Sequence, residues 1–247
     1  MDDSLLAALL TAVLAGIGGL LVPSLVARLP EPAPAASDDG EPDGEPDGEP
    51  GKMLYADIAA RPGLGWRSAL VAAASGALVG GATGLDWSLL WLVPLVPLGV
   101  ALSVVDWHTQ LLPRVVVVPA TLALLVLVTV VGLATDERDA LVRALLASIA
   151  ARSFFWVLWA VRSAGMGFGD VRLAAPIGLV LGWVGWGAFA VGVWVSFILF
   201  AVPALAVVAV RRDRTLLKRS FPFGPFMVGG ALLGLVWGTA IAGRIWG

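Results

Sequence analysis

Long apolar stretches, separated by short polar connections, run through this chain from one end to the other. The sequence is 59% hydrophobic and 14% charged, whereas soluble domains are about 45–50% apolar. A helix that spans a membrane needs about 20 apolar residues. We therefore expect an all-α polytopic membrane protein, one domain over residues 1–247, with about eight transmembrane helices near 4–27, 66–85, 87–105, 114–134, 139–161, 171–188, 189–210 and 222–243.

Two of these boundaries fall inside longer apolar runs. Residues 171–210 are too long for one span and carry a single charge, so we place a tight turn in the glycine-rich segment 182–187. Residues 66–105 need a similar break, which we place at 83–86, where a glycine and an acid favour a short exposed loop. These breaks turn two long runs into four helices.

The segment 30–52 has the opposite composition from its surroundings. It is rich in Pro, Asp, Glu and Gly, and the tetrapeptide Glu-Pro-Asp-Gly occurs at 41–44 and again at 45–48. Such a segment lacks apolar residues to bury, so we predict a disordered acidic loop within the domain. We interpret it as a solvated linker; the alternative is that its acids attract a basic peptide.

Two aspartates, Asp106 and Asp170, stand at the edges of predicted spans. An ionisable side chain at membrane depth is costly unless it faces a bundle interior or a wet cavity, so each is a functional candidate. Two carboxylates close together cannot both ionise easily and share a proton. Such a pair can activate water and protonate a carbonyl oxygen, which is the chemistry of peptide hydrolysis. The two groups titrate together, so the acid and base roles belong to the pair.

Three glycines precede the second aspartate, at Gly165, Gly167 and Gly169. Glycine permits sharp turns and close approach of another backbone, so we interpret this segment as an active-site loop that admits substrate. The alternative is helix packing, for which glycine is also common in membranes. The presence of Asp106 elsewhere in the chain favours the first interpretation.

Lys and Arg are distributed unevenly over the predicted connections, and such asymmetry sets membrane orientation. With the N-terminus outside, the inside segments hold twelve of the sixteen: Arg28, Lys52, Arg61, Arg67, Arg114, Arg162, Arg172, Arg211, Arg212, Arg214, Lys218 and Arg219. Both aspartates then lie at cytoplasmic helix ends, where they can meet. We therefore expect a multi-pass membrane protein with its active site at the cytoplasmic face.

Composition also excludes several kinds of site. The chain has no cysteine and one histidine, which excludes disulfides, cysteine-ligated zinc, a thiol nucleophile and a serine–histidine triad. Peptide hydrolysis by two aspartates needs no cofactor and no metal. The basic residues are spread over short loops, so we expect no nucleic-acid partner. His108 could orient Asp106 or be a boundary histidine, and Arg172 could bind a substrate carbonyl or only set topology.

Four motifs occur together and in a recognisable order. The run 165–173, Gly-Met-Gly-Phe-Gly-Asp-Val-Arg-Leu, resembles the GxGD signature of the bacterial type IV prepilin peptidases, which are membrane aspartic peptidases. The segment 106–113, an aspartate followed seven residues later by proline, resembles their first aspartate motif. Residues 221–226, Phe-Pro-Phe-Gly-Pro-Phe, resemble the start of the family's last helix, and 28–30 resemble the end of its first.

The resemblance implies an aspartic endopeptidase that removes the leader of prepilins or pseudopilins. It also implies substrates with a short basic leader before an apolar helix, and catalytic roles for Asp106 and Asp170. Membrane lipid is the other expected partner, and the resemblance implies a location in a bacterial inner or plasma membrane. Family members commonly carry paired CxxC motifs after the first helix, and this chain has none there. The departure makes N-methylation of the processed substrate doubtful.

Other classes of protein remain as alternatives. A proton-coupled transporter also places acids and flexible glycines near the bilayer. Transporters usually contain internal repeats with broken helices in matching positions, and this sequence shows none. A membrane scaffold without catalytic activity is a further alternative, against which the presence of both aspartates argues.

Overall fold

The computed structural model describes residues 2–31, 53–161, 167–211 and 221–246. The described residues form helices and contain no strand, which confirms the predicted all-α class. The helices are α1 (Asp3–Leu20), α2 (Val22–Ala27), α3 (Tyr55–Ala59), α4 (Leu64–Thr83), α5 (Leu89–Thr109), α6 (Arg114–Ala134), α7 (Arg138–Val161), α8 (Phe168–Val184), α9 (Trp186–Arg211) and α10 (Gly224–Trp246).

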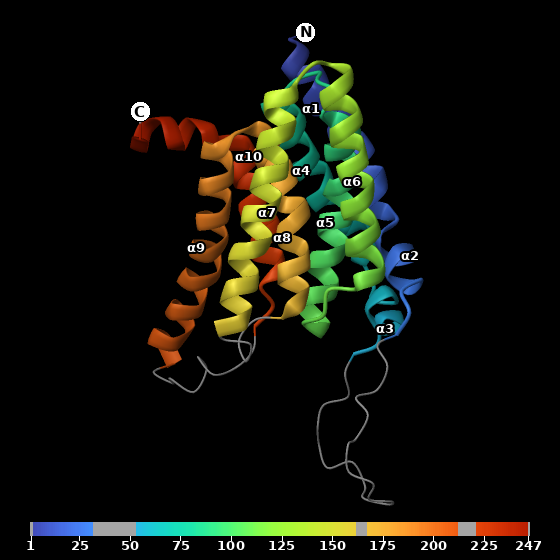
Figure 1. The fold of residues 1–247 in the computed structure, drawn as a ribbon. Coiled ribbons are helices and arrows are strands. Elements are labelled where there is room, and N and C mark those ends of the chain that lie inside the picture. The colour runs from blue at the N-terminus through green and yellow to red at the C-terminus, as the bar shows by residue number, and fades with distance from the viewer. Residues whose placement is uncertain (1, 32–52, 162–166, 212–220, 247) are drawn as a thin grey trace, which may run out of the picture.

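The long helices stand side by side and alternate in direction, as Figure 1 shows. The end of α5, the start of α8 and the start of α10 lie at the same end of this bundle, the lower end in Figure 1. We call it the site end. Both chain termini lie at the opposite end. This topology brings together three segments that are far apart in the sequence.

Each of the eight expected spans corresponds to a long helix, with shifts at the ends. Six described helices are long and apolar enough to cross a membrane, and this supports a multi-pass membrane protein. The other two are α8, which has 17 residues, and α4, which contains Arg67 and many small residues. The predicted span 4–27 is divided at Leu21, because Pro23 has no N–H to continue the helix.

Three pairs of neighbouring helices pack most closely: α1 with α4, α7 with α8, and α9 with α10. Small residues make this possible. A Cβ on Gly76 of α4 would lie 2.5 Å from the carbonyl oxygen of Thr11 in α1. A Cβ on Gly178 of α8 would lie 2.6 Å from the carbonyl oxygen of Ala147 in α7. Membrane helices have no hydrophobic drive toward each other, so close contact of this kind supplies the association energy.

The break between α8 and α9 falls at Gly185, inside the predicted turn segment 182–187, which is confirmed. The last carbonyls of a helix lack intrahelical partners. Here Arg143 of α7 satisfies two of them, since its guanidinium group donates to the carbonyl oxygens of Gly182 and Trp183 at 2.7 Å each. The predicted break at 83–86 is confirmed as well, because α4 ends at Thr83 and α5 begins at Leu89.

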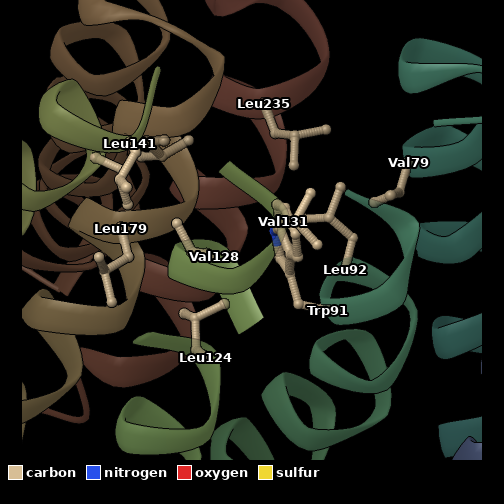
Figure 2. Close-up of a cluster of buried hydrophobic side chains, with 11 residues drawn as sticks. Val79, Trp91, Leu92, Leu124, Val128, Val131, Leu141, Leu179 and Leu235 are labelled. Atoms are coloured by element: carbon tan, nitrogen blue, oxygen red, sulfur yellow. The ribbon is translucent and has the colours of Figure 1, made fainter. Parts of the chain in front are cut away.

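A buried apolar cluster occupies the half of the bundle away from the site end. Figure 2 shows side chains of α4, α5, α6, α7, α8 and α10 converging there. Trp91 is 1% exposed and packs edge-on against Trp183, with ring centroids 5.2 Å apart. Edge-to-face aromatic pairs contribute about 0.5–1.5 kcal/mol beyond their buried area. The cluster therefore anchors the start of α5, and the end of the same helix carries the site.

Candidate active site

Asp106 lies inside α5, one turn before the helix ends. We expected this span to stop at residue 105 with the acid at its edge, and that boundary is wrong, because α5 continues to Thr109. The helix ends at Gln110, which has a left-handed φ of 55° and donates its N–H to the carbonyl oxygen of Asp106. The Asp106 side chain is 3% exposed and therefore needs hydrogen-bond partners inside the protein.

One partner comes from the first residue of α10. The Gly224 N–H donates to Asp106 Oδ2 at 2.8 Å. The first N–H groups of a helix have no intrahelical acceptor and carry partial positive charge, so they favour a carboxylate. A Cβ on Gly224 would lie 2.7 Å from Asp106 Oδ2. Only glycine allows this approach, and Pro225 after it suits the first turn of a helix.

Asp170 lies in the first turn of α8 and is 6% exposed. Its N–H donates to the carbonyl oxygen of Gly167, which caps the helix. Our prediction of a loop through Gly169 is wrong, because that glycine is already helical. Gly169 instead allows α8 to approach the segment that follows α5, because a Cβ at this position would lie 2.8 Å from Leu112 Cβ. Gly165 lies outside the described residues.

The two aspartates therefore come from different helices and meet at the site end. Their carboxyl groups lie close enough to interact electrostatically. The surrounding packing holds the three elements together, because Leu102 of α5, Val171 of α8 and Met227 of α10 belong to one buried cluster. Two buried carboxyl groups in such proximity can hold one proton between them. That arrangement can both accept a proton from water and donate one to a substrate.

The other two predicted site residues contact different partners. The imidazole of His108 forms hydrogen bonds with the Arg61 guanidinium group and with the Val104 carbonyl oxygen, the latter at 2.8 Å. It therefore links α5 to the segment before α4. The Arg172 guanidinium group lies over the ring of Phe168, 4.8 Å from its centroid. This contact lies within the first turns of α8.

The short helix α3 was not predicted, and it packs beside the first aspartate. Tyr55, which is 3% exposed, shares a buried cluster with Val105 of α5. Burial raises the pKa of Tyr55, and its hydroxyl group forms a hydrogen bond with Thr109 at the end of α5. The carboxylate of Glu31 accepts hydrogen bonds from the Tyr55 and Ala56 N–H groups at 3.0 Å each. α3 is therefore fastened to the helix that carries Asp106.

Sequence reasoning quoted the residues around Gly224 as a motif and assigned no role to them. The signal was present, since a glycine followed by proline before an apolar run marks a helix start with a free N–H. No local pattern marks Tyr55 as a partner of Thr109. Its role depends on a contact between segments that are far apart in the chain.

Comparison with known proteins gives a consistent result. Residues 92–210 match the type IV leader peptidase family. The chain is 33% identical over 187 residues to a prepilin leader peptidase/N-methyltransferase of Burkholderia pseudomallei (strain K96243), covering 72% of this chain and 57% of that protein. It is 30% identical over 158 residues to one of Pseudomonas putida, covering 64% and 49%. The chain thus spans about half the length of these curated relatives. No solved structure matches it.

Proposed function

This chain belongs to the type IV leader peptidase family, and from that premise we propose that it is a membrane aspartic endopeptidase. Its substrates are prepilin-like precursors, from which it removes the leader peptide. The observation that carries the proposal is the meeting of Asp106 and Asp170, both buried, at one end of the bundle. Family membership favours this function over a proton-coupled transporter or a scaffold without catalytic activity.

In the proposed reaction, the ionised carboxylate of the pair takes a proton from water as the water oxygen attacks the scissile carbonyl carbon. The protonated carboxyl group donates to the carbonyl oxygen. Collapse of the tetrahedral intermediate breaks the C–N bond. The leaving amine takes the proton that came from water, and a hydroxyl group of the intermediate returns a proton to the other carboxylate, which restores the pair. The Gly224 N–H, 2.8 Å from Asp106 Oδ2, supports the ionised form of that carboxylate.

The site's position also constrains the substrate. Asp106 and Asp170 each lie near the end of a long helix, with apolar helix surface on one side and the chain's connecting segments on the other. A substrate with a basic leader followed by an apolar helix places its cleavage point at this boundary. We propose that the boundary is the cytoplasmic one, because arginine and lysine are concentrated in the segments at this end.

The test is cleavage of a cognate prepilin by the full chain in membranes. Asp106→Asn and Asp170→Asn each remove an ionisable carboxyl group with little change of shape, so each variant should insert normally and lose leader cleavage. Asp139→Asn, an exposed acid near the start of α7, is the matched control and should cleave normally. Near-normal cleavage by either of the first two variants would exclude the aspartate pair as the catalyst.

Orientation can be tested separately, since the chain has no cysteine of its own. Single cysteines at Gly44 and Ser163 should react with an impermeant thiol reagent only from the cytoplasmic side. A cysteine at Glu137, between α6 and α7, should react only from the other side. Labelling of positions 44 and 163 from opposite sides would contradict a shared cytoplasmic site.

We also propose that the chain cleaves without methylating the new N-terminus. The relatives named above are called leader peptidase/N-methyltransferases, whereas this chain lacks cysteine throughout. The two aspartates suffice for hydrolysis, so cleavage and methylation can be separated. Mass spectrometry of the mature substrate, made in a host without its own prepilin peptidase, should show the unmodified N-terminus. A gain of one methyl group that depends on this chain would contradict the proposal.

A further inference from the structure

A long apolar cavity lies beside the candidate site and does not include either aspartate in its lining. Its volume is about 670 Å³, and its walls come from α4, α5, α6, α8 and α10. Along α4 the lining extends from Leu64 to Val79, which corresponds to roughly 22 Å at 1.5 Å per residue. The cavity therefore runs from the site end of the bundle toward the buried cluster of Figure 2.

The end of the cavity nearest the site has a different character from the rest. Arg67 and His108 line it, and the Arg61 guanidinium group forms a hydrogen bond with the His108 imidazole. Within the described residues, neither of the two arginines forms an ion pair with a carboxylate. Trp107, 58% exposed, lines this mouth, and Trp66, 56% exposed, lies against the Arg67 guanidinium group. Exposed tryptophans near the ends of membrane helices are typical of the membrane–water interface.

We propose that this cavity binds an anionic phospholipid, with its phosphate at Arg61 and Arg67 and its acyl chain along α4 and α5. An apolar cavity in a bilayer fills with hydrocarbon, and basic pockets between membrane helices at the cytoplasmic side hold anionic headgroups. Guanidinium groups suit phosphate because they donate several hydrogen bonds in a fixed geometry. The lipid is an occupant separate from the peptide substrate.

Charge distinguishes this occupant from a peptide with a basic leader. Such a peptide would meet Arg61 and Arg67 at the mouth, neither of which is ion-paired with a described carboxylate, and like charges repel. An acyl chain under a negatively charged headgroup matches both the apolar walls and the positive charge at the mouth.

Occupation by lipid has a structural consequence for the site. Three residues of the cavity wall are neighbours of the site: Ser103, Leu173 and Pro225. Ser103 precedes Asp106 by one turn, Leu173 follows Asp170 by one turn, and Pro225 is next to Gly224. These residues belong to α5, α8 and α10, the three helices that carry the site. A bound acyl chain fills the space between these helices and α4. The lipid thereby supports a region where a cavity interrupts the contact between helices.

The experiment uses the purified full chain in phosphatidylcholine vesicles that contain increasing fractions of brominated phosphatidylglycerol, which quenches nearby tryptophan. The signal from Trp66 and Trp107 is obtained by difference, as the quenching that is lost in the variant carrying both Trp66→Phe and Trp107→Phe. Half-maximal quenching should need a several-fold lower fraction of brominated phosphatidylglycerol than of brominated phosphatidylcholine. Arg67→Gln and Arg61→Gln should each raise that fraction about fivefold.

Two further variants make the result specific. Arg138→Gln, an exposed arginine paired with Asp136 at the other end of the bundle, is the matched control and should change nothing. Ser75→Phe places a ring in the cavity and should reduce quenching without altering the charge at the mouth. Arg67→Lys keeps the charge and should retain most of the binding, and Arg61→Gln tests the phosphate site if Arg67→Gln does not fold.

Three outcomes would overturn the proposal. Equal quenching by the two brominated lipids would show that the headgroup is not recognised. Unchanged quenching in the Arg67 and Arg61 variants, with wild-type melting, would remove the phosphate site. Relief of quenching by a synthetic apolar helical peptide, regardless of lipid charge, would assign the cavity to a peptide instead. None of these results depends on catalytic activity.

Discussion

The α9–α10 pair and the site end of α5 differ in how closely their backbones approach other helices. In the pair, a Cβ on Gly234 would lie 2.5 Å from the Cα of Gly192, so backbone touches backbone. Around α5, by contrast, contacts with α4 and α10 are interrupted by a cavity of about 670 Å³ that all three helices line. α5 also contains Pro94 and Pro97, each of which removes a helical hydrogen bond.

This difference indicates a division of roles. Backbone contact through small residues gives dispersion energy and fixes geometry, and no side chain can adjust within it. The region around α5 has fewer close contacts, polar groups at its end and space for a ligand. We therefore expect substitutions in the close pairs to lower stability, and substitutions at the site end to lower activity at nearly constant stability.

The largest expected effect is in a close pair. Gly230→Val should destabilise the protein by about 3 kcal/mol, the upper part of the roughly 1–3 kcal/mol that overpacking typically costs, because the facing backbone cannot move away. A Cβ at this position would meet backbone and the Ser196 side chain of α9. Gly243→Val on the same helix is the control, because a Cβ there meets nothing within 4 Å. Thermal unfolding in detergent measures both, and equal melting of the two variants would contradict the account of the pair.

The second effect concerns the opposite region. Gly224→Ala should lower leader cleavage about 100-fold, as loss of one preorganised donor does in other active sites, while melting changes little. The added Cβ would lie 2.7 Å from Asp106 Oδ2 and displace either the carboxylate or the start of α10. Gly243→Ala serves as control for helix propensity. If Gly224→Ala melted as low as Gly230→Val, the separation of the two regions would fail.

A smaller effect is expected from the link between α3 and α5. Tyr55→Phe removes one hydroxyl group and its hydrogen bond to Thr109, which corresponds to about 1 kcal/mol. Tyr55 is a positioning residue in this account, so kcat should fall about threefold to fivefold with KM unchanged. Steady-state kinetics on a prepilin substrate would show it. A change in KM alone would instead indicate direct contact with substrate.

The two regions also differ in what their sequence predicts. The long apolar runs predicted the helices, and the glycines at 84 and 185 marked the two breaks, because hydrophobic length and turn propensity are local properties. The predicted helix ends near Asp106 and Asp170 differ from the observed ends by a few residues, because a helix can continue through polar residues beyond its apolar run. Whether two helices touch through glycine depends on both helices, so the sequence of one segment does not predict it. For the same reason the roles of Gly224 and Tyr55 appeared only in the structure.

The central claim is that Asp106 and Asp170 act as one unit, and a double-substitution cycle measures it most directly. Leader cleavage is compared for Asp106→Asn, Asp170→Asn and the variant carrying both, with insertion and melting checked for each. Groups that act together lose nearly all their effect when either is removed. Each single variant should therefore fall to the same residual rate as the double variant. Measurable activity in one single variant, or losses that multiply in the double variant, would show that the two aspartates act independently.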